Sequence, residues 1–307
     1  MGSCNCADSK NELGSVNVDD VQKPKNPKCL ESEEGMGSVD SPKDYLLPKE
    51  SDYEPNSPTQ TMSLALQSVY RSLPEFSVPS TKGPIIISEG LYEGALSSDQ
   101  IPDGQGRLIT SDIIKEGMWE SGKLNGKCRI VTGNGEVFVG NFKDNVKEGY
   151  GEFTGASDYK GHWKNDLPDG NGVEVWKTGC KYEGEYLKGL RTGSGIFLWK
   201  DGSKYEGKFK NNKIEGQGTY WGADGKMYKG SWKNNMMHGK GKFVWKDGKN
   251  YKGEYVKNEK HGFGVLTLAN GKKYEGQWFK GKQHGKGVLY YKNTEKKGEW
   301  KQGKFCM

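Results

Sequence analysis

Three histidines, His238, His261 and His284, recur every 23 residues in this chain of 307 residues. Imidazole is a common metal ligand, and the ligands of one ion must all lie within about 2 Å of it. Residues repeated on stacked strand pairs instead lie about 10 Å apart, because each strand occupies about 4.8 Å of a sheet. We therefore expect these histidines to be turn residues that close hairpins, and we expect neither a metal nor a cofactor.

Motifs of nucleotide binding and hydrolysis are absent from the sequence. Pairs such as Gly149-Tyr-Gly151 are frequent, but no third glycine follows at the spacing of a dinucleotide-binding loop. The chain also has no P-loop, no Gly-x-Ser-x-Gly and no His-Glu-x-x-His. The sequence therefore predicts a protein that is not an enzyme.

The chain begins Met1-Gly2-Ser3-Cys4-Asn5-Cys6, which offers chemistry of another kind. A glycine after the initiator methionine is required for N-myristoylation, because the acyl group is transferred to its freed amine. The segment resembles the dual-acylation signal of membrane-anchored signalling proteins, which implies myristate on Gly2 and palmitate on Cys4 and Cys6. The alternatives are a coincidental start or a weak pair of metal ligands.

A phrase of the form Tyr-x-Gly-x-aromatic repeats about every 23 residues and dominates the second half of the chain. A second phrase, Gly-x-Gly, follows each first one after a short polar stretch. A fixed period in this range indicates a repeat architecture. The residues that define the repeat are Tyr182, Gly184, Tyr205, Gly207, Phe209, Tyr228, Gly230, Trp232, Tyr251, Gly253, Tyr255, Tyr274, Gly276 and Trp278.

Alternation along a strand explains why the repeat needs both residue types. Side chains of a strand point alternately to its two faces, so Tyr205, Gly207 and Phe209 share one face. Two such segments joined by a polar turn form a β-hairpin. Glycine leaves room for an aromatic ring to lie across the strands, and stacked hairpins bury one another's rings.

This pattern resembles the MORN repeat over roughly residues 90–307. The resemblance implies an all-β fold, a single-layer ribbon of stacked antiparallel hairpins, with about nine repeats and a C-terminal half repeat in residues 84–307. It also implies a non-enzymatic scaffold, as in radial-spoke-head and cortical MORN proteins of cilia and the cytoskeleton. We expect protein partners on the face that carries the aromatic residues and glycines.

Residues 1–83 differ from the repeats in composition. They carry 8 Lys/Arg and 13 Asp/Glu, whereas residues 84–307 carry 38 and 27. Rich in proline and serine, this acidic segment is expected to be mostly disordered, because it buries too little apolar area to offset the entropy of ordering. Within it, residues 61–73 show helical spacing of apolar side chains before Pro74. We interpret this helix as a cap on the first repeat, the alternative being a helix that binds a partner.

Charge on the repeats suggests a second function. Lysines in predicted turns, Lys229, Lys233, Lys240 and Lys242, would bind anionic headgroups such as phosphoinositides, as in an accessory subunit of a separate lipid or signalling enzyme. We favour the scaffold, because the excess positive charge is small and interleaved with acids. No nucleic-acid partner is expected, since the aromatic residues are needed for packing between repeats. The predicted location is the cytoplasmic face of a membrane, a cilium or the cytoskeleton, and the chain has no secretory signal.

The last repeat ends before its second glycine strand is complete. Gly298, Trp300 and Phe305 belong to this half repeat. An open strand edge is available for pairing with another chain. The sequence therefore predicts partner docking or a homodimer through this edge.

Overall fold

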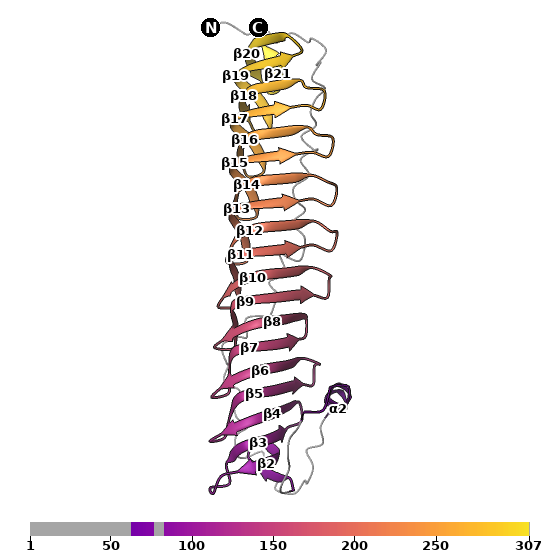
Figure 1. Cartoon of the computed structure of the whole chain (residues 1–307), viewed down its shortest axis with the longest axis vertical. Coiled ribbons are helices and arrows are strands. Elements are labelled where there is room, and N and C mark those ends of the chain that lie inside the picture. The colour runs from indigo at the N-terminus through magenta and orange to yellow at the C-terminus, as the bar shows by residue number, and fades with distance from the viewer. Residues whose placement is uncertain (1–62, 77–82, 307) are drawn as a thin grey trace, which may run out of the picture. The chain divides into compact units, whose positions relative to one another are not determined.

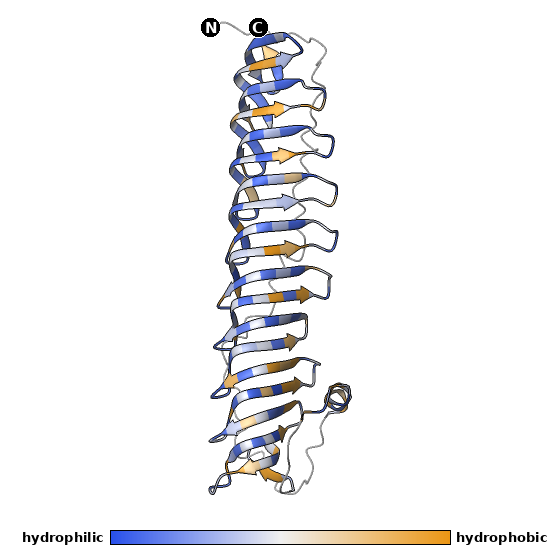
Figure 2. Ribbon diagram, viewed as in Figure 1, coloured by the Kyte–Doolittle hydropathy of each residue, from blue (hydrophilic) through white to orange (hydrophobic). Residues whose placement is uncertain are grey.

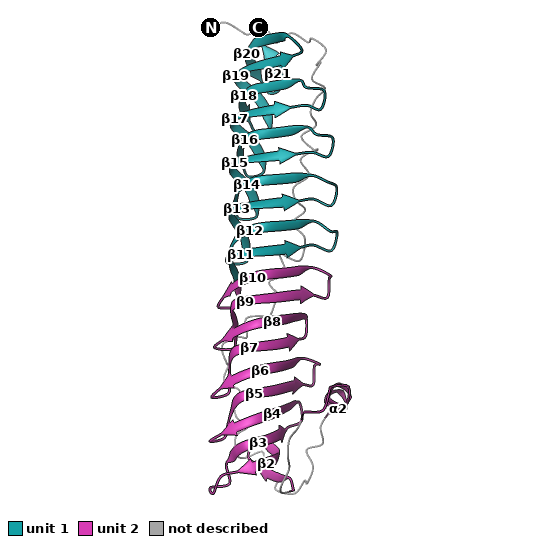
Figure 3. Ribbon diagram, viewed as in Figure 1, with its two compact units in different colours: residues 1–31, 191–307 teal, residues 32–190 magenta. Residues whose placement is uncertain are grey.

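The computed structural model describes residues 63–76 and 83–306, which fall into two compact units (Figure 3). Unit 2 lies within residues 32–190 and contains α2 (Leu64–Arg71), β1 (Ile85–Ile87), β2 (Gly90–Leu96), β3 (Pro102–Ile109), β4 (Ile113–Glu120), β5 (Lys123–Thr132), β6 (Val137–Lys143), β7 (Val146–Thr154), β8 (Ser157–Lys164), β9 (Leu167–Trp176) and β10 (Lys181–Leu187). Unit 1, from residue 191 on, contains most of β11 (Leu190–Leu198), then β12 (Lys204–Lys210), β13 (Lys213–Trp221), β14 (Met227–Lys233), β15 (Met236–Val244), β16 (Asn250–Val256), β17 (Glu259–Thr267), β18 (Lys273–Phe279), β19 (Lys282–Tyr291), β20 (Thr294–Lys301) and β21 (Lys304–Cys306).

Strands in both units follow one pairing rule. Within each unit, every strand pairs antiparallel with the next strand along the chain (Figure 1). Apolar residues recur at the ends of several second strands of the hairpins, such as Ile196 to Leu198 of β11 (Figure 2). The expected all-β fold of stacked antiparallel hairpins is confirmed.

The turn between β12 and β13 shows why the polar stretch favours asparagine. Asn211 and Asn212 have φ of 49° and 65°, a left-handed conformation that asparagine tolerates better than most residues. With both central residues left-handed, the turn matches the right-handed twist of the flanking strands. The same pair of left-handed asparagines, Asn234 and Asn235, joins β14 to β15.

Tyrosines of the repeat lie on one face of each sheet, here called the inner face, and cross the paired glycines. Tyr205 is 0% exposed, and its hydroxyl donates to the Lys208 carbonyl at 3.1 Å. A Cβ added to Gly218 would lie 2.2 Å from the Tyr205 Oη. The ring therefore occupies the space that a side chain at Gly218 would need.

Rings of neighbouring hairpins interlock on the inner face. The Trp232 ring packs edge-on against Tyr228 of its own hairpin at 5.0 Å and against Tyr205 of the preceding hairpin at 5.5 Å. The pairing register of β14 and β15 shifts between Gly230 and Trp232, where β15 has the extra residues of a bulge. Burial raises the pKa of Tyr205 and Tyr228. The inner face is thus a core, and our expectation that partners bind there is wrong.

Asparagine side chains also join several hairpins to the preceding one. Asn235 Oδ1 accepts from the Ile214 amide at 2.7 Å, and the Asn235 amide donates to the Ile214 carbonyl at 3.0 Å. Asn258 holds Met237 in the same way, with Oδ1 2.7 Å from the Met237 amide nitrogen. These contacts fix the second turn residue of these two hairpins against the second strand of the preceding hairpin.

Replacing Asn235 with Ala should lower the free energy of unfolding of unit 1 by about 1–2 kcal/mol. The change removes one hydrogen bond to a partly buried amide and places Ala in a left-handed conformation. Asn235→Asp keeps the acceptor oxygen and should remain within about 0.5 kcal/mol of wild type. Urea denaturation measures both, and equal stability of the two variants would contradict the proposed role of this side chain.

Candidate functional site

The helix α2 is the element that joins the N-terminal segment to the repeats. Its first turn is capped by Ser63, whose Oγ accepts from the Leu66 amide at 3.2 Å. The Ser63 amide donates to the Ser111 carbonyl in the turn between β3 and β4, at 3.0 Å. The helix covers residues 64–71, inside the predicted range of 61–73. No helix among the described residues is long and apolar enough to span a membrane.

Apolar side chains of α2 pack on the face opposite the aromatic core, here called the outer face. Trp119 of β4 points inward, so Ile114 and Glu116, at odd spacing from it, point outward. Leu66 of α2 packs against Ile114 and Val131, and all three are 0% exposed. Val69, Tyr70, Leu73, Ile109 and Val137 surround them. We expected the helix to dock on the first repeat as a cap, and it packs on the outer sheet face against Ile114 of β4 and Val131 of β5.

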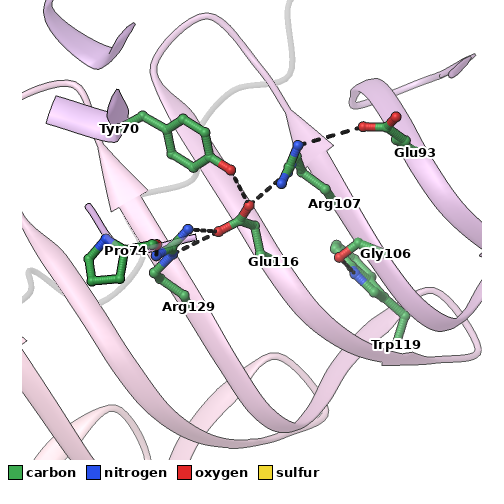
Figure 4. Close-up of polar contacts among 8 residues, drawn as sticks. All are labelled: Tyr70, Pro74, Glu93, Gly106, Arg107, Glu116, Trp119 and Arg129. Atoms are coloured by element: carbon green, nitrogen blue, oxygen red, sulfur yellow. Dashed lines mark hydrogen bonds and ion pairs between the residues drawn. The ribbon is translucent and has the colours of Figure 1, made fainter. Parts of the chain in front are cut away.

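A buried carboxylate lies beneath the helix. Glu116 is 0% exposed, and its Oε1 accepts from Arg107 Nε at 2.7 Å and from the Tyr70 hydroxyl at 2.5 Å (Figure 4). Its Oε2 accepts from Arg129 Nε at 2.7 Å and lies 2.6 Å from Arg129 Nη2. Four donor contacts and two guanidinium charges compensate the cost of burying this charge.

The segment after α2 closes over the same arginines. Arg129 Nη1 donates to the Pro74 carbonyl at 2.6 Å, and its guanidinium lies 5.1 Å from the centre of the Phe76 ring. Arg107 reaches Glu93 of β2 at 3.7 Å, and both guanidiniums lie 5.5 Å from the Tyr70 ring centre. Residues 63–76 are therefore held by apolar contacts, cation–π contacts and charged hydrogen bonds together.

Electrostatics of this cluster favour binding and not catalysis. Glu93, Arg107, Glu116 and Arg129 lie directly opposite one another on four adjacent strands, with alternating charge. Burial and the hydrogen bond to Glu116 raise the pKa of Tyr70. Burial opposes the charge of Arg107, but the hydrogen bond and charge of Glu116 outweigh it and raise the pKa of Arg107. Both oxygens of Glu116 are already engaged, so the carboxylate serves to hold α2.

Docking of α2 should weaken at alkaline pH. Because the pKa of Tyr70 is raised above its ordinary value of 10.0 in the folded state, its contribution to stability is complete below pH 10 and is lost as the pH rises through the folded value. NMR of ¹³Cζ-labelled tyrosine, assigned with Tyr70→Phe, should give a midpoint above 10. Glu116→Gln should move that midpoint downward, and an unchanged midpoint would show that Glu116 does not set it.

The three repeated histidines lie in strands and not in the turns where we expected them. His238, His261 and His284 are in strands β15, β17 and β19, each before a left-handed glycine, and not in turns. His261 and His284 pack against the Phe279 ring, with centroids 5.4 and 5.7 Å away. Within residues 63–76 and 83–306, no group of three His, Cys, Asp or Glu is placed to hold a metal.

Lysines expected in turns are mostly on strands. Lys229 lies in β14, and Lys240 and Lys242 lie in β15, all exposed on the outer face or beside the bulge; Lys233 is the last residue of β14. Gly2, Cys4 and Cys6 lie outside the described residues.

The C-terminal half repeat is more complete than expected. β21 pairs with β20, and the Phe305 ring covers Gly298, where an added Cβ would lie 2.4 Å from Phe305 Cε2. Trp300 is 3% exposed and packs against Tyr274 at 4.9 Å and Phe305 at 5.0 Å. These residues belong to the aromatic core, so the predicted docking edge does not present Gly298 or Trp300.

Stacked hairpins with an aromatic inner face and a helix bound to the outer face define a repeat protein of the scaffold or binding type. A family model for the MORN repeat matches eight consecutive segments, and the chain belongs to the MORN-repeat family. The matched segments are residues 116–137, 138–158, 159–181, 182–204, 205–227, 228–249, 251–273 and 274–295.

Similar proteins share only parts of the chain. Alsin of Rattus norvegicus is 32% identical over 75 residues, 22% of this chain and 4% of Alsin, and human Alsin is 31% identical over the same length. The chain thus matches about 4% of the length of these relatives. The TCP10 domain of Danio rerio CPAP is 10% identical with a TM-score of 0.36, covering 64% of this chain and 94% of that domain. The Drosophila melanogaster SAS-4 TCP domain, solved with a proline-rich motif of Ana2, is 12% identical with a TM-score of 0.24, covering 66% and 96%.

Proposed function

We propose that this protein is a non-enzymatic scaffold whose outer face binds helical segments of protein partners, while its N-terminus tethers it to the cytoplasmic face of a membrane. One observation carries the binding part: the outer face of β3–β5 already holds an amphipathic helix through an apolar centre and a charged row. The inner face is filled by its own rings, so the outer face is the surface available to partners.

The tether rests on Gly2, Cys4 and Cys6, whose types and spacing match dual acylation. A single myristoyl chain binds membranes only marginally, with a constant of about 10⁴ M⁻¹, so palmitate on the cysteines would supply the second signal. Docking of α2 supports this arrangement, because it attaches the chain to the repeats at a point 61 residues or more after Gly2.

Comparing the membrane fraction of a tagged full chain with a Gly2→Ala variant tests the tether. We expect the wild type to sediment with membranes and Gly2→Ala to become largely soluble, because palmitoylation commonly follows myristoylation at such a start. Cys4→Ser with Cys6→Ser should also reduce the membrane fraction, leaving the weaker single-chain anchor. Asn5→Ala is the matched control, as it changes neither acylated position.

A wild-type chain and a Gly2→Ala chain that remain together on a cilium or a cortical structure would overturn the membrane tether. In that outcome the repeats alone direct assembly, and the ciliary or cytoskeletal location becomes the better proposal.

A further inference from the structure

Strands β13–β15 of unit 1 reproduce the apolar half of the α2 docking surface. On β3–β5, Ile109 faces Ile114, which faces Val131. On β13–β15, the same outer positions hold Trp221, Met227 and Val244, again directly opposite one another. These three residues and the lysines described next are called the second cradle.

The second cradle lacks the cover that α2 gives the first. Ile114 and Val131 are 0% exposed beneath the helix, whereas Trp221 is 37% exposed and its neighbours are half-buried. The Trp221 ring has a lysine ammonium, that of Lys204, 4.9 Å from its centre. Trp221 lies at the end of β13, and a large, partly exposed aromatic side chain beside a charged surface is a typical anchor for a partner.

Charge distinguishes the two cradles. In the first, Arg107 and Arg129 flank Glu116. In the second cradle, Lys229 occupies the position equivalent to Glu116, and it faces Lys242 on β15. The row then continues on β16, because Lys242 faces Lys252.

No ion pair links Lys229, Lys242 or Lys252 to any of the described residues, and all three are exposed. Like charges directly opposite on adjacent strands are destabilising, so this row lowers the stability of the folded state unless an anion binds to it. At an equivalent pairing in unit 2, the structure has Lys160 opposite Glu152, 2.9 Å apart. At most other equivalent pairings a charged residue faces Val, Ile or Thr, as Glu206 faces Thr219 and Glu275 faces Val288, so three successive lysines are unusual in these repeats.

We propose that the second cradle docks an acidic amphipathic helix of a protein partner. Apolar side chains of that helix would cover Trp221, Met227 and Val244, as Leu66 and Val69 cover the first cradle. Where Tyr70 meets Glu116, the partner would present Asp or Glu to Lys229 and Lys242. This inference rests on the proposed function as a scaffold and specifies the chemistry of one partner.

A peptide derived from α2 provides the probe. We would label a peptide of residues 61–76 carrying Tyr70→Glu and Arg71→Glu with fluorescein and titrate it with the full-length protein at low salt, measuring anisotropy. The unaltered peptide, which lacks the added acids, is the matched control peptide. Burial of an acid beside Glu116 would disfavour the acidic peptide at the first cradle, so binding there is minimised.

We expect saturable binding of the acidic peptide that is weakened at least about tenfold in a Lys229→Glu/Lys242→Glu protein and about fivefold in Trp221→Ala. Lys282→Glu/Lys286→Glu, an equal change of charge on exposed residues of β19, should leave binding within about twofold. Circular dichroism checks that each variant retains its fold.

Three outcomes would overturn the inference: no saturable binding at the highest protein concentration, equal weakening by both double substitutions, or unchanged binding in Trp221→Ala. Vesicles containing phosphatidylserine form a separate arm, and loss of vesicle binding in Lys229→Glu/Lys242→Glu without peptide binding would assign the lysine row to a membrane. These results are independent of the Gly2→Ala experiment. Helix binding at the second cradle can therefore be disproved without affecting the proposed membrane tether.

Discussion

Glu116→Gln should detach α2 and lower the free energy of unfolding of unit 2 by about 3 kcal/mol. The substitution keeps the size of the side chain but leaves Arg107 and the buried Arg129 without their shared counter-charge. Removing one partner of a buried ion pair typically costs about 3–5 kcal/mol, because the remaining charge stays desolvated. Exposure of Arg107 places the expected value at the lower end of this range.

Hydrogen exchange distinguishes release of the helix from general weakening. Amides of residues 67–71 should lose most of their protection in Glu116→Gln, while those of β9 and β10 change little. Glu93→Gln is the matched control, since Glu93 is about a third exposed and 3.7 Å from its arginine, and should cost less than about 1 kcal/mol. If α2 keeps its protection in Glu116→Gln, apolar packing alone holds the helix and the role assigned to the cluster is wrong.

Sequence periodicity was sufficient to predict the repeats because their determinants are local. Tyr205, Gly207 and the turn Asn211-Asn212 each specify part of one hairpin, and the next hairpin repeats them as Tyr228, Gly230 and Asn234-Asn235. The helix at residues 64–71 was predictable for the same reason, as its apolar spacing and the following Pro74 lie within one short segment.

The alternation of side chains along a strand does not predict which face of the sheet is free to bind a partner. The pattern separates the faces that carry Tyr205 and Glu206, but it does not show that Trp232 of the next hairpin packs against Tyr205 and covers its ring. The aromatic face was therefore interpreted as a partner surface when it is a core. Likewise Phe305 was interpreted as part of an open edge, although it fills the place above Gly298 that a tyrosine takes in other repeats.

The α2 docking surface was missed because it depends on contacts distant in sequence. Tyr70 and Glu116 are separated by 46 residues, and Arg129 and Pro74 by 55. Charged residues at outward positions of a sheet usually form exposed cross-strand pairs. In the sequence, Arg107, Glu116 and Arg129 cannot be distinguished from such exposed residues. One feature of the sequence could have indicated this surface. Ile109, Ile114, Val131 and Val137 are apolar residues at outward positions of four adjacent strands, and such a row is unusual on a sheet face exposed to solvent.

Gly241→Ala should destabilise unit 1 by about 3 kcal/mol. An added Cβ would lie 2.4 Å from Tyr228 Oη and 2.6 Å from its Cζ, far inside contact distance. Tyr228 has no room to move, because its hydroxyl donates to the Ser231 carbonyl at 2.9 Å and its ring packs edge-on against Trp232 and Tyr255. Forcing extra volume into such a site commonly costs about 1–3 kcal/mol, and a rigid ring places this case at the top of that range.

Comparison with Gly202→Ala separates the steric cost of an added Cβ from the cost of placing alanine in a left-handed backbone conformation. Gly202 has φ of 86° and nothing within 4 Å of an added Cβ, so its substitution should cost only the left-handed penalty of about 1 kcal/mol. Gly241 has no left-handed φ, and its cost is purely steric. In a double-mutant cycle measured by urea denaturation, Tyr228→Leu should therefore relieve part of the Gly241→Ala penalty and none of the Gly202→Ala penalty. Additive effects of Tyr228→Leu and Gly241→Ala would show that ring and glycine are independent, and the Tyr-x-Gly repeat would then need an explanation other than a ring seated on bare backbone.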